Sequence, residues 1–406
     1  MSFSAYIAQR LDSAPSSTFV RLVTRIAIGS IALGLAVILM AHAIFLGFRQ
    51  EVIQKIVSIA GHIQITKYDL NNSYQTLPLS TQWQGYQNPK QFWGVQTIQG
   101  FSQKAALLYT AGEVQGLMIK GIGPDYDSTL LCQSLQAGRY IRFDTTQKYG
   151  RDLLISQYVA DQINLQVGDQ VNVMFVQDPP RYNRLRICGI YQTGIEQFDQ
   201  LIAWGDHRLL QYLNNWEDSL AGGYEVILYR FDDLPKSFAA LSEKLPYDLW
   251  AMPVTEQYRE FFDWFVMLER NVLILMSVIL VVVIFNTISV ILILITERTR
   301  MIGMLKALGA TNAQIQRIFF YKTLRITTQG LFWGNLIGLG FCWIEDRLRW
   351  IPLDPTNYYL DAVPIGWDIP AILGFNLLML ALLWLMVFLP LRVILGIRPV
   401  AAIRFD

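Results

Sequence analysis

A basic, helix-forming segment directly behind a long apolar run constrains this chain more than any other feature. The apolar run, residues 272–295, contains no charged side chain and is long enough to cross a bilayer, which takes about 20 helical residues. The segment behind it, residues 296–311, carries two arginines and a lysine and ends near Gly309, a residue type that commonly stops a helix. A cytoplasmic helix fixed to the end of a membrane span lets a soluble motor push on that span. The arrangement indicates a motor-driven membrane machine and argues against an enzyme.

Hydropathy predicts an α-helical membrane protein with four transmembrane helices. Apolar residues make up 53% of the chain and charged residues 16%, which suits a membrane protein with one sizeable water-exposed portion. The predicted spans are residues 26–48, 272–295, 326–344 and 369–395. The third is the least apolar because it holds Gln329, Asn335 and four glycines. Small residues are common where membrane helices pack closely, so the segment is still predicted to span the membrane.

Basic residues near the span ends predict the orientation of the chain. The N-terminal segment 1–25, the connection 296–325 and the tail 396–406 each carry more arginine and lysine than acid. The short connection 345–368 instead carries five acids against two arginines. Both termini are therefore expected in the cytoplasm. The insert between the first two spans, residues 49–271, is expected outside and is large enough for one large or two small domains.

Two features of the chain leave alternatives open. Ala41-His42-Ala43 superficially resembles a signal-peptide cleavage site, but the apolar run around it is too long for a signal core, so we expect a retained anchor. Cys132 and Cys188 lie in the insert, where a disulfide could persist. Their wide separation favours two buried thiols over a bridge. Cys342, in the third span, is expected to be a small packing residue.

The insert is predicted to be a large mixed α+β domain, with a helical stalk at each end. Strand patterns cover residues 61–66, 152–156 and 224–229, and a helix is expected at 235–245. Hairpins are predicted within residues 106–121 and 171–191. Residues 70–101, rich in Gln, Asn, Tyr and Trp, are assigned to loops and a partner-facing surface.

Several functional classes lack their sequence signatures. The insert carries slightly more acid than base, so it offers no basic stripe for nucleic acid. The three histidines are isolated and have no zinc-ligand spacing. No phosphate-binding Gly-x-x-x-x-Gly-Lys-Ser/Thr loop and no Gly-x-Ser-x-Gly elbow occur. We therefore expect no catalytic residue, metal or cofactor on this chain, and any ATP hydrolysis on a separate polypeptide.

Three blocks of the chain resemble a known family. They are Gly47-Phe48-Arg49-Gln50-Glu51 with Gly61-His62-Ile63-Gln64-Ile65, Ile302-Gly303-Met304-Leu305-Lys306-Ala307-Leu308-Gly309-Ala310 behind Phe285-Asn286-Thr287, and Arg398-Pro399-Val400-Ala401-Ala402. The pattern resembles the FtsX/MacB-type (mechanotransmission) ABC permeases, and within them the lipoprotein-releasing permeases of the Lol system. The resemblance implies a multi-pass protein of the bacterial inner membrane whose large domain is periplasmic.

The resemblance implies that the segment behind the second span docks onto an ATPase. The expected ATPase-coupling residues are Glu297, Ile302, Gly303, Leu305, Lys306, Leu308 and Gly309. The implied partners are a cytoplasmic ABC ATPase dimer, which binds ATP and Mg, and a second permease that is either a copy of this chain or a related paralogue. The competing interpretation is a solvated juxtamembrane helix that only satisfies the charge rule.

An apolar wall is expected where the first two spans meet the outer leaflet. Its members would be Met40, Ile44, Phe48, Phe261, Phe265, Leu268 and Val272, and they would form a groove for membrane lipid or for the lipid anchor of a lipoprotein. Met40, Ile44 and Phe48 share one helical face. An aromatic interfacial belt or plain helix packing explains the same residues equally well. Asn286, inside the second span, is expected to hydrogen-bond between helices.

A hairpin tip in the insert corresponds to the place where one permease type of the family catches a soluble periplasmic lipoprotein chaperone. The chaperone-facing residues would be Pro179, Pro180, Arg181 and Tyr182. The hairpin here is short, whereas the family's hairpin is a long hook.

The leading expectation is a permease subunit that extracts lipoproteins from the outer leaflet of the inner membrane for delivery to the outer membrane. Two alternatives remain. The chain could transmit ATPase motion to an external partner such as a cell-wall hydrolase, or it could export another amphipathic substrate.

Overall fold

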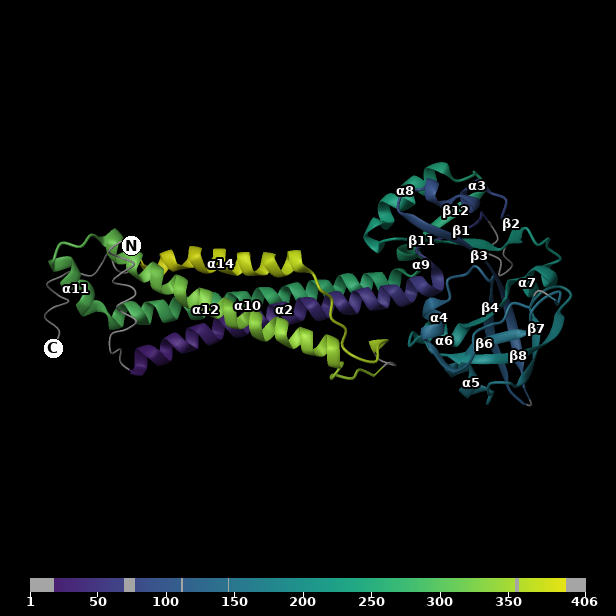
Figure 1. Cartoon of the computed structure of the whole chain (residues 1–406), viewed down its shortest axis with the longest axis horizontal. Coiled ribbons are helices and arrows are strands. Elements are labelled where there is room, and N and C mark those ends of the chain that lie inside the picture. Colours follow the sequence, from purple (N-terminus) through teal and green to yellow (C-terminus); the bar gives the residue numbers. More distant parts are fainter. Residues whose placement is uncertain (1–17, 69–76, 111, 145, 355–357, 392–406) are drawn as a thin grey trace. The chain divides into compact units, whose positions relative to one another are not determined.

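The computed structural model describes residues 18–68, 77–110, 112–144, 146–354 and 358–391. Contacts divide the chain into two compact units, which are described separately (Figure 1). The helical unit holds Met1–Gln50, Trp264–Pro352 and Ala362–Asp406, and the external unit holds Glu51–Asp263 and Leu353–Asp361. The chain therefore passes between the units four times. Residues 1–17 and the tail 396–406, with its family-like ending, lie outside the described residues.

Five helices make up the described part of the helical unit. They are α2 (Thr18–Ala60), α10 (Arg259–Glu297), α11 (Thr299–Ala307), α12 (Asn312–Leu348) and α14 (Ile369–Leu391), and α2 and α10 also contribute residues to the external unit. Within the described residues, three helices are long and apolar enough to cross a membrane, namely α2, α10 and α14. The predicted third span belongs to α12, which does not meet that measure because Thr327, Gln329 and Asn335 lower its hydropathy. The count of four spans stays a prediction.

Helix α12 begins well before the predicted third span. Thr311 forms a capping box with Gln314: the Gln314 amide donates to Thr311 Oγ1 at 3.3 Å, and the Thr311 amide donates to Gln314 Oε1 at 2.9 Å. Residues 312–325, which the hydropathy pattern places in the cytoplasmic connection, are therefore the first turns of one continuous helix. Hydropathy locates where a helix becomes apolar, whereas the cap locates where it starts.

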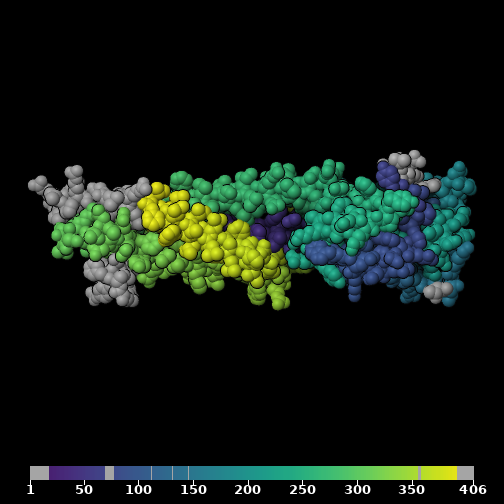
Figure 2. Space-filling model, turned by 90° about the horizontal axis from the view of Figure 1, so that it is seen from above, coloured from purple at the N-terminus to yellow at the C-terminus, as the bar shows by residue number. Residues whose placement is uncertain are grey.

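One apolar core holds the helices of this unit together. It contains Ile31, Leu35 and Leu39 of α2, Met276 and Val283 of α10, Ile326 of α12, and Met379 and Leu383 of α14. A polar clasp joins α12 to α14, because Asn335 Nδ2 donates to Asn376 Oδ1 at 2.7 Å and Asn376 Nδ2 donates back at 3.0 Å. Figure 2 shows the side chains of α14, in yellow, against those of α12, in yellow-green. Satisfied amides of this kind hold helices in register inside a membrane.

Glycines let α12 approach α2 closely. A Cβ on Gly330 would lie 2.6 Å from Ile31 Cγ2, and a Cβ on Gly334 would lie 2.9 Å from the Ala32 carbonyl oxygen. Gly338 faces Ala36 in the same way, at 3.0 Å from its Cα. The three glycines recur every fourth residue and so share one face of α12. Backbone contact of this kind needs residues without side chains.

Leucine at Gly334 is therefore expected to push α12 off α2 and to lower stability by about 1–3 kcal/mol, the usual cost of overpacking. Gly340 provides the matched control, because a Cβ there meets nothing within 4 Å. The thermal unfolding midpoint of the detergent-solubilised chain should fall for Gly334→Leu and stay near wild type for Gly340→Leu. Equal midpoints for the two variants would show that the glycine face does not support the packing.

The external unit is a mixed α+β domain with two β-sheets. Its strands are β1 (Ile63–Lys67), β2 (Leu79–Ser80), β3 (Val95–Tyr109), β4 (Val114–Ile122), β5 (Leu135–Gly138), β6 (Asp152–Ser156), β7 (Gln170–Phe175), β8 (Arg181–Tyr191), β9 (Ile202–Asp206), β10 (Leu220–Ala221), β11 (Gly223–Leu228) and β12 (Leu249–Pro253). The short helices are α3 (Gln84–Gln87), η1 (Pro89–Gln91), α4 (Thr129–Gln133), α5 (Gln157–Gln162), α6 (Glu196–Leu201), α7 (His207–Asn214), η2 (Phe231–Asp233), α8 (Leu234–Lys244) and α9 (Val254–Gln257).

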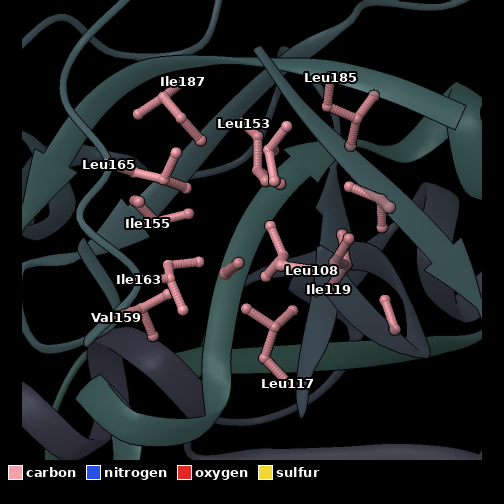
Figure 3. Packing of buried hydrophobic residues seen from close by; sticks show 14 of the residues in the cluster. Leu108, Leu117, Ile119, Leu153, Ile155, Val159, Ile163, Leu165, Leu185 and Ile187 are labelled. Atoms are coloured by element: carbon pink, nitrogen blue, oxygen red, sulfur yellow. The ribbon is translucent and has the colours of Figure 1, made fainter. Parts of the chain in front are cut away.

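Six of these strands close on themselves. The pairings run β3–β4–β9–β6–β8–β7 and return to β3, with β4–β9 and β6–β8 parallel and the other pairs antiparallel. Residues at alternate positions point into a closed sheet. Figure 3 shows the result: apolar side chains of β3, β4, β6 and β8 turn toward one another, and residues of α5 pack beside them. The labelled members include Leu108, Leu117, Ile119, Leu153, Ile155, Leu185 and Ile187.

Three more strands extend this ring into an antiparallel ladder, β12–β1–β11–β3. Strand β5 pairs with β8, and β2 and β10 form the second sheet. The first half of β3 pairs with β11 and the second half with β4 and β7, so one strand of 15 residues belongs to both parts. The assignment of residues 70–101 to loops is therefore wrong at β2, α3, η1 and from Val95 onward, and residues 70–76 lie outside the described residues. Gln96 is exposed and Thr97 half-buried there, while Val95, Ile98 and Phe101 are buried together with the polar Gln99.

All three cysteines are free, so the alternative of a bridge between Cys132 and Cys188 is not realised. Cys188 and Cys342 are buried, as expected. Cys132 is exposed at the end of α4, which differs from the expected buried thiol.

Candidate functional site

The segment behind α10 folds into a short helix with two distinct faces. Ile302 and Gly303 of α11 are buried, and Ile302 packs into a cluster with Ile295, Ile315 and Phe319. Met304 is 49% exposed and Leu308 is 85% exposed. Gly309 ends the segment with a φ of +89°, a left-handed conformation that suits glycine at a helix C-terminus. The buried face positions the helix on its own chain, and the outward face is available to another protein.

The predicted coupling residues therefore fall into two groups. Ile302 and Gly303 belong to the chain's own core, and Leu305 is half-buried against the same cluster. The other four are Glu297, Lys306, Leu308 and Gly309, of which all but the half-buried Lys306 are exposed. The sequence analysis did not include Met304 among the coupling residues. Its position on the helix directly after buried Ile302 and Gly303 could have indicated that it points outward.

An aromatic cluster joins α2 to the start of the apolar part of α10. The Phe48 ring packs edge-on against Trp264 and Phe265, with ring centroids 5.7 and 6.3 Å away, and Trp264 lies 5.5 Å from Phe265. Phe265 is 3% exposed, so it lies inside this contact. The sequence predicted Phe48 and Phe265 as neighbours across two spans. Trp264, which belongs to the same aromatic run, contacts both of them.

The other predicted wall residues are spread more widely. Met40, Ile44, Leu268 and Val272 are half-buried in the helical unit, and Val272 packs against the apolar core there. Phe261 belongs to the external unit, where its ring lies edge-on to Tyr359 at 6.0 Å. Asn286 is half-buried on α10, and its expected role between helices stays a prediction.

Beside the aromatic cluster, α10 presents an outward apolar strip, which the exposed polar residues 269–271 interrupt. Its members are 48–62% exposed: Val266, Met267, Leu273, Ile274, Leu275 and Val278. An apolar surface of this length on a helix is expected to face lipid, an acyl chain or another apolar protein surface.

The hairpin between β7 and β8 places its predicted residues in different environments. Pro179 and Pro180 are exposed, and Tyr182 is 72% exposed. Arg181 is instead held by the domain itself, because its guanidinium donates to the Tyr212 carbonyl at 3.2 Å and to Asn215 Oδ1 at 3.1 Å. The predicted tip extends too far along the chain, since Arg181 and the following residues already belong to β8.

A buried ion pair, which the sequence pattern did not indicate, fixes the end of α2. Lys120 of β4 lies 2.5 Å from the Glu225 carboxylate of β11, and both side chains are 1% exposed. Lys120 also donates to the Ile59 carbonyl in the last turn of α2, where helix carbonyls lack intrahelical partners. Tyr126 donates to the other Glu225 oxygen at 2.8 Å. Burial lowers the pKa of Lys120, and the attraction of Glu225 opposes that shift.

One turn earlier on α2, Lys55 forms a second attachment. Its Nζ donates to the Thr193 carbonyl and to the Tyr359 carbonyl, each at 2.7 Å. Burial lowers the pKa of Lys55, and the carboxylates of Asp361, Glu51 and Asp199 oppose this. Lys55 and Ile59 are four residues apart and share one helical face, so both attachments fix the same side of α2.

Comparison with known proteins defines the class. A model described as "MacB-like periplasmic core domain" matches residues 24–233, which is more than half of the chain, and one described as "FtsX-like permease C-terminal" matches residues 273–399. The chain belongs to the FtsX/MacB-type permease family, with a MacB-like core domain followed by an FtsX-like permease region. Proteins of this kind are permease subunits of ABC transporters and are not themselves enzymes.

Named relatives match most or all of the chain. The lipoprotein-releasing system transmembrane protein LolC of Neisseria meningitidis serogroup B is 23% identical over 100% of both chains. LolC of Xylella fastidiosa (strain Temecula1) is 23% identical over 96% of this chain and 95% of its own, and LolE of Haemophilus influenzae is 22% identical over 85% of each.

Two solved structures are similar to part of the chain. The periplasmic region of MacB from Actinobacillus actinomycetemcomitans matches with a TM-score of 0.35 and 14% identity, covering 50% of this chain and 95% of that one. The extracellular domain of the noncanonic ABC-type transporter YknZ from Gram-positive bacteria matches with a TM-score of 0.32 and 13% identity, covering 47% of this chain and 98% of that one.

Proposed function

We propose that this chain is the transmembrane permease of an ATP-driven complex that lifts lipoproteins out of the outer leaflet of the bacterial inner membrane for delivery to the outer membrane. The observation that carries the proposal is the end-to-end similarity to a lipoprotein-releasing permease, 23% identical over the whole of both chains. On this chain the match to the MacB-like core domain, residues 24–233, precedes the match to the FtsX-like permease region, residues 273–399.

The exposed apolar side chains of α10 suit the removal of acyl chains from a bilayer. Withdrawing an acyl chain from a bilayer costs about 0.8 kcal/mol per CH₂ group, so two or three chains cost tens of kcal/mol and need a motor. The apolar strip beside the Phe48–Trp264–Phe265 cluster offers such chains an alternative apolar surface, and each Å² buried there returns about 25 cal/mol. The cluster itself is packed within the chain. The acyl chains are therefore proposed to lie against the exposed strip.

The motor is proposed to be a separate cytoplasmic ABC ATPase dimer that binds ATP and Mg and pushes on α11. A second permease, either a second copy or a paralogue, would complete the complex. The chain would hold no cofactor of its own. The exposed Pro179, Pro180 and Tyr182 are proposed to meet a periplasmic chaperone, with Arg181 supporting the tip from behind.

A photo-crosslinking amino acid in place of Met267, which is 53% exposed on the strip, is expected to capture lipoprotein in membranes, because acyl chains contact this surface before release. ATP should reduce the adduct. The matched control is Tyr247, a fully exposed aromatic residue of the external unit, where little lipoprotein should be captured.

Equal capture at both positions would mean that the strip is an ordinary lipid-facing surface. Capture at Met267 that ATP leaves unchanged would mean the same. If a cell-wall hydrolase co-purified with the chain in place of a lipoprotein, the lipoprotein-release function would be rejected in favour of the signalling alternative.

A further inference from the structure

Residues 353–361 belong to the external unit although they connect two helices of the helical unit. The chain leaves α12, contributes this short stretch to the external unit, and then returns to α14. Leu360 is 2% exposed, and the Tyr359 ring lies edge-on to Phe261 at 6.0 Å. The described residues at the end of the connection are thus packed on the domain by apolar contacts of Tyr359 and Leu360.

Lys55 supplies the polar part of this attachment. The Nζ of a lysine has three protons to donate, and two of them reach carbonyls from different segments, Thr193 and Tyr359. Tyr359 has a φ of +62°, a conformation that costs energy in a residue other than glycine and persists only where its surroundings hold it. The ammonium therefore joins the last part of α2, the segment behind β8 and the 353–361 connection at one point.

Hydrogen bonds within the segment that follows β8 hold the Thr193 carbonyl in place for Lys55. Asp199 accepts from the Thr193 amide at 3.0 Å, from Thr193 Oγ1 at 2.8 Å and from the Gly194 amide at 3.1 Å. Gly194 has a φ of +79°, and a Cβ on it would lie 3.2 Å from the Tyr359 carbonyl oxygen and 3.5 Å from Lys55 Nζ. A glycine is needed for both the conformation and the close approach.

We propose that Lys55 is a positioning residue that locks the 353–361 connection onto the external domain beside α2, so that the α12–α14 pair is carried along when α2 moves. The proposal deepens the release function proposed above and rests on it. Without the lock, α2 and α10 still join the external domain to the helical unit. The 353–361 connection, which is the third link between the two units, is then no longer held firmly to the external domain. ATP would then be hydrolysed with less lipoprotein released per turnover.

The test uses the full chain with its ATPase and partner permease in lipid nanodiscs. Lys55→Met keeps the aliphatic stem and removes the donors, whereas Lys55→Arg keeps donors and charge. Lys90→Met is the matched control, because Lys90 is an exposed lysine of η1. Hydrogen exchange is followed at the Leu353 and Tyr358 amides, which bond within the connection to the carbonyls of Asp361 at 2.9 Å and Asp354 at 3.0 Å.

Lys55→Met is expected to speed exchange at these amides about ten- to a hundredfold, the effect of losing a hydrogen bond to a charged donor. It should lower the lipoprotein released per ATP severalfold while hydrolysis stays within about twofold of wild type. Lys55→Arg should restore both readouts substantially, and Lys90→Met should match wild type.

Unchanged exchange in Lys55→Met would overturn the lock, and faster exchange with normal release per ATP would overturn its role in release. A wild-type complex that hydrolyses ATP but releases no lipoprotein would refute the release function instead. The exchange rates would still decide whether Lys55 holds the connection.

Discussion

Replacing Lys120 with methionine is expected to destabilise the external unit by about 3–5 kcal/mol, the usual cost of removing one partner of a buried ion pair. The change leaves the Glu225 carboxylate at 1% exposure without its cation, and it leaves the Ile59 carbonyl without the donor that caps α2. The rings of Trp204, Phe101 and Tyr126, whose centroids lie 4.8 to 5.4 Å from Nζ, attract a cation but not a carboxylate. The hydrogen bond from the Tyr126 hydroxyl to Glu225 would remain but would not replace the cation. Hydrogen exchange of the β4 and β11 amides in the solubilised chain measures the loss.

Two further variants separate the charge from the packing. In Lys120→Met combined with Glu225→Leu neither charge of the pair remains, so no unpaired charge is left at this place and much of the stability should return. Lys104→Met is the matched control: Lys104 is also buried on β3, but its ammonium donates to the neutral Asn214 amide, so its loss should cost only about 1 kcal/mol. If Lys120→Met proved no worse than Lys104→Met, the pair would not stabilise the end of α2.

Replacing Leu308 with aspartate is expected to weaken ATPase binding at least about a hundredfold and to abolish coupled turnover. Leu308 is 85% exposed, so the change should leave the permease folded. If the ATPase covers this side chain, binding would bury an unpaired carboxylate, which costs several kcal/mol. Co-purification of the ATPase and its stimulated hydrolysis are the measurements.

Leu348→Asp is the control for Leu308→Asp, because Leu348 is a comparably exposed leucine at the opposite end of α12. It should retain the ATPase. Ile302→Asp would be less informative, since Ile302 lies in the chain's own core and its loss would disturb α11 itself. Full ATPase retention by Leu308→Asp would place the docking surface elsewhere.

The parts of the fold that the sequence predicts are those with a local signal. Spans 26–48 and 272–295 are long uninterrupted apolar runs, and Gly309 marks a helix end by its conformational freedom. The external strands at 106–121 and 171–191 follow from alternation and a turn between them. The first half of β3 was missed because its polar side chains, which include the buried Gln99, resemble those of a loop and its burial does not alternate.

The parts that the sequence could not predict depend on contacts between distant residues. Lys120 and Glu225 are 105 positions apart, and Lys55 and Tyr359 are 304 apart. Each looks like an ordinary surface charge or loop residue in its own segment. The candidate coupling residues were named as one set, but their division into a buried and an outward face depends on where α12 and α14 pack, which residues 296–311 alone do not reveal.

The ladder β12–β1–β11–β3 has a mechanical consequence. Strand β1 begins three residues after α2 ends and pairs on both of its edges, five residues with β12 and three with β11. Hydrogen bonds in antiparallel pairs lie perpendicular to the strands. A pull directed along β1 would therefore load both rows of bonds in shear, so that they share the force and do not open one after another. The domain can in this way receive repeated pulls at its first strand without being peeled apart.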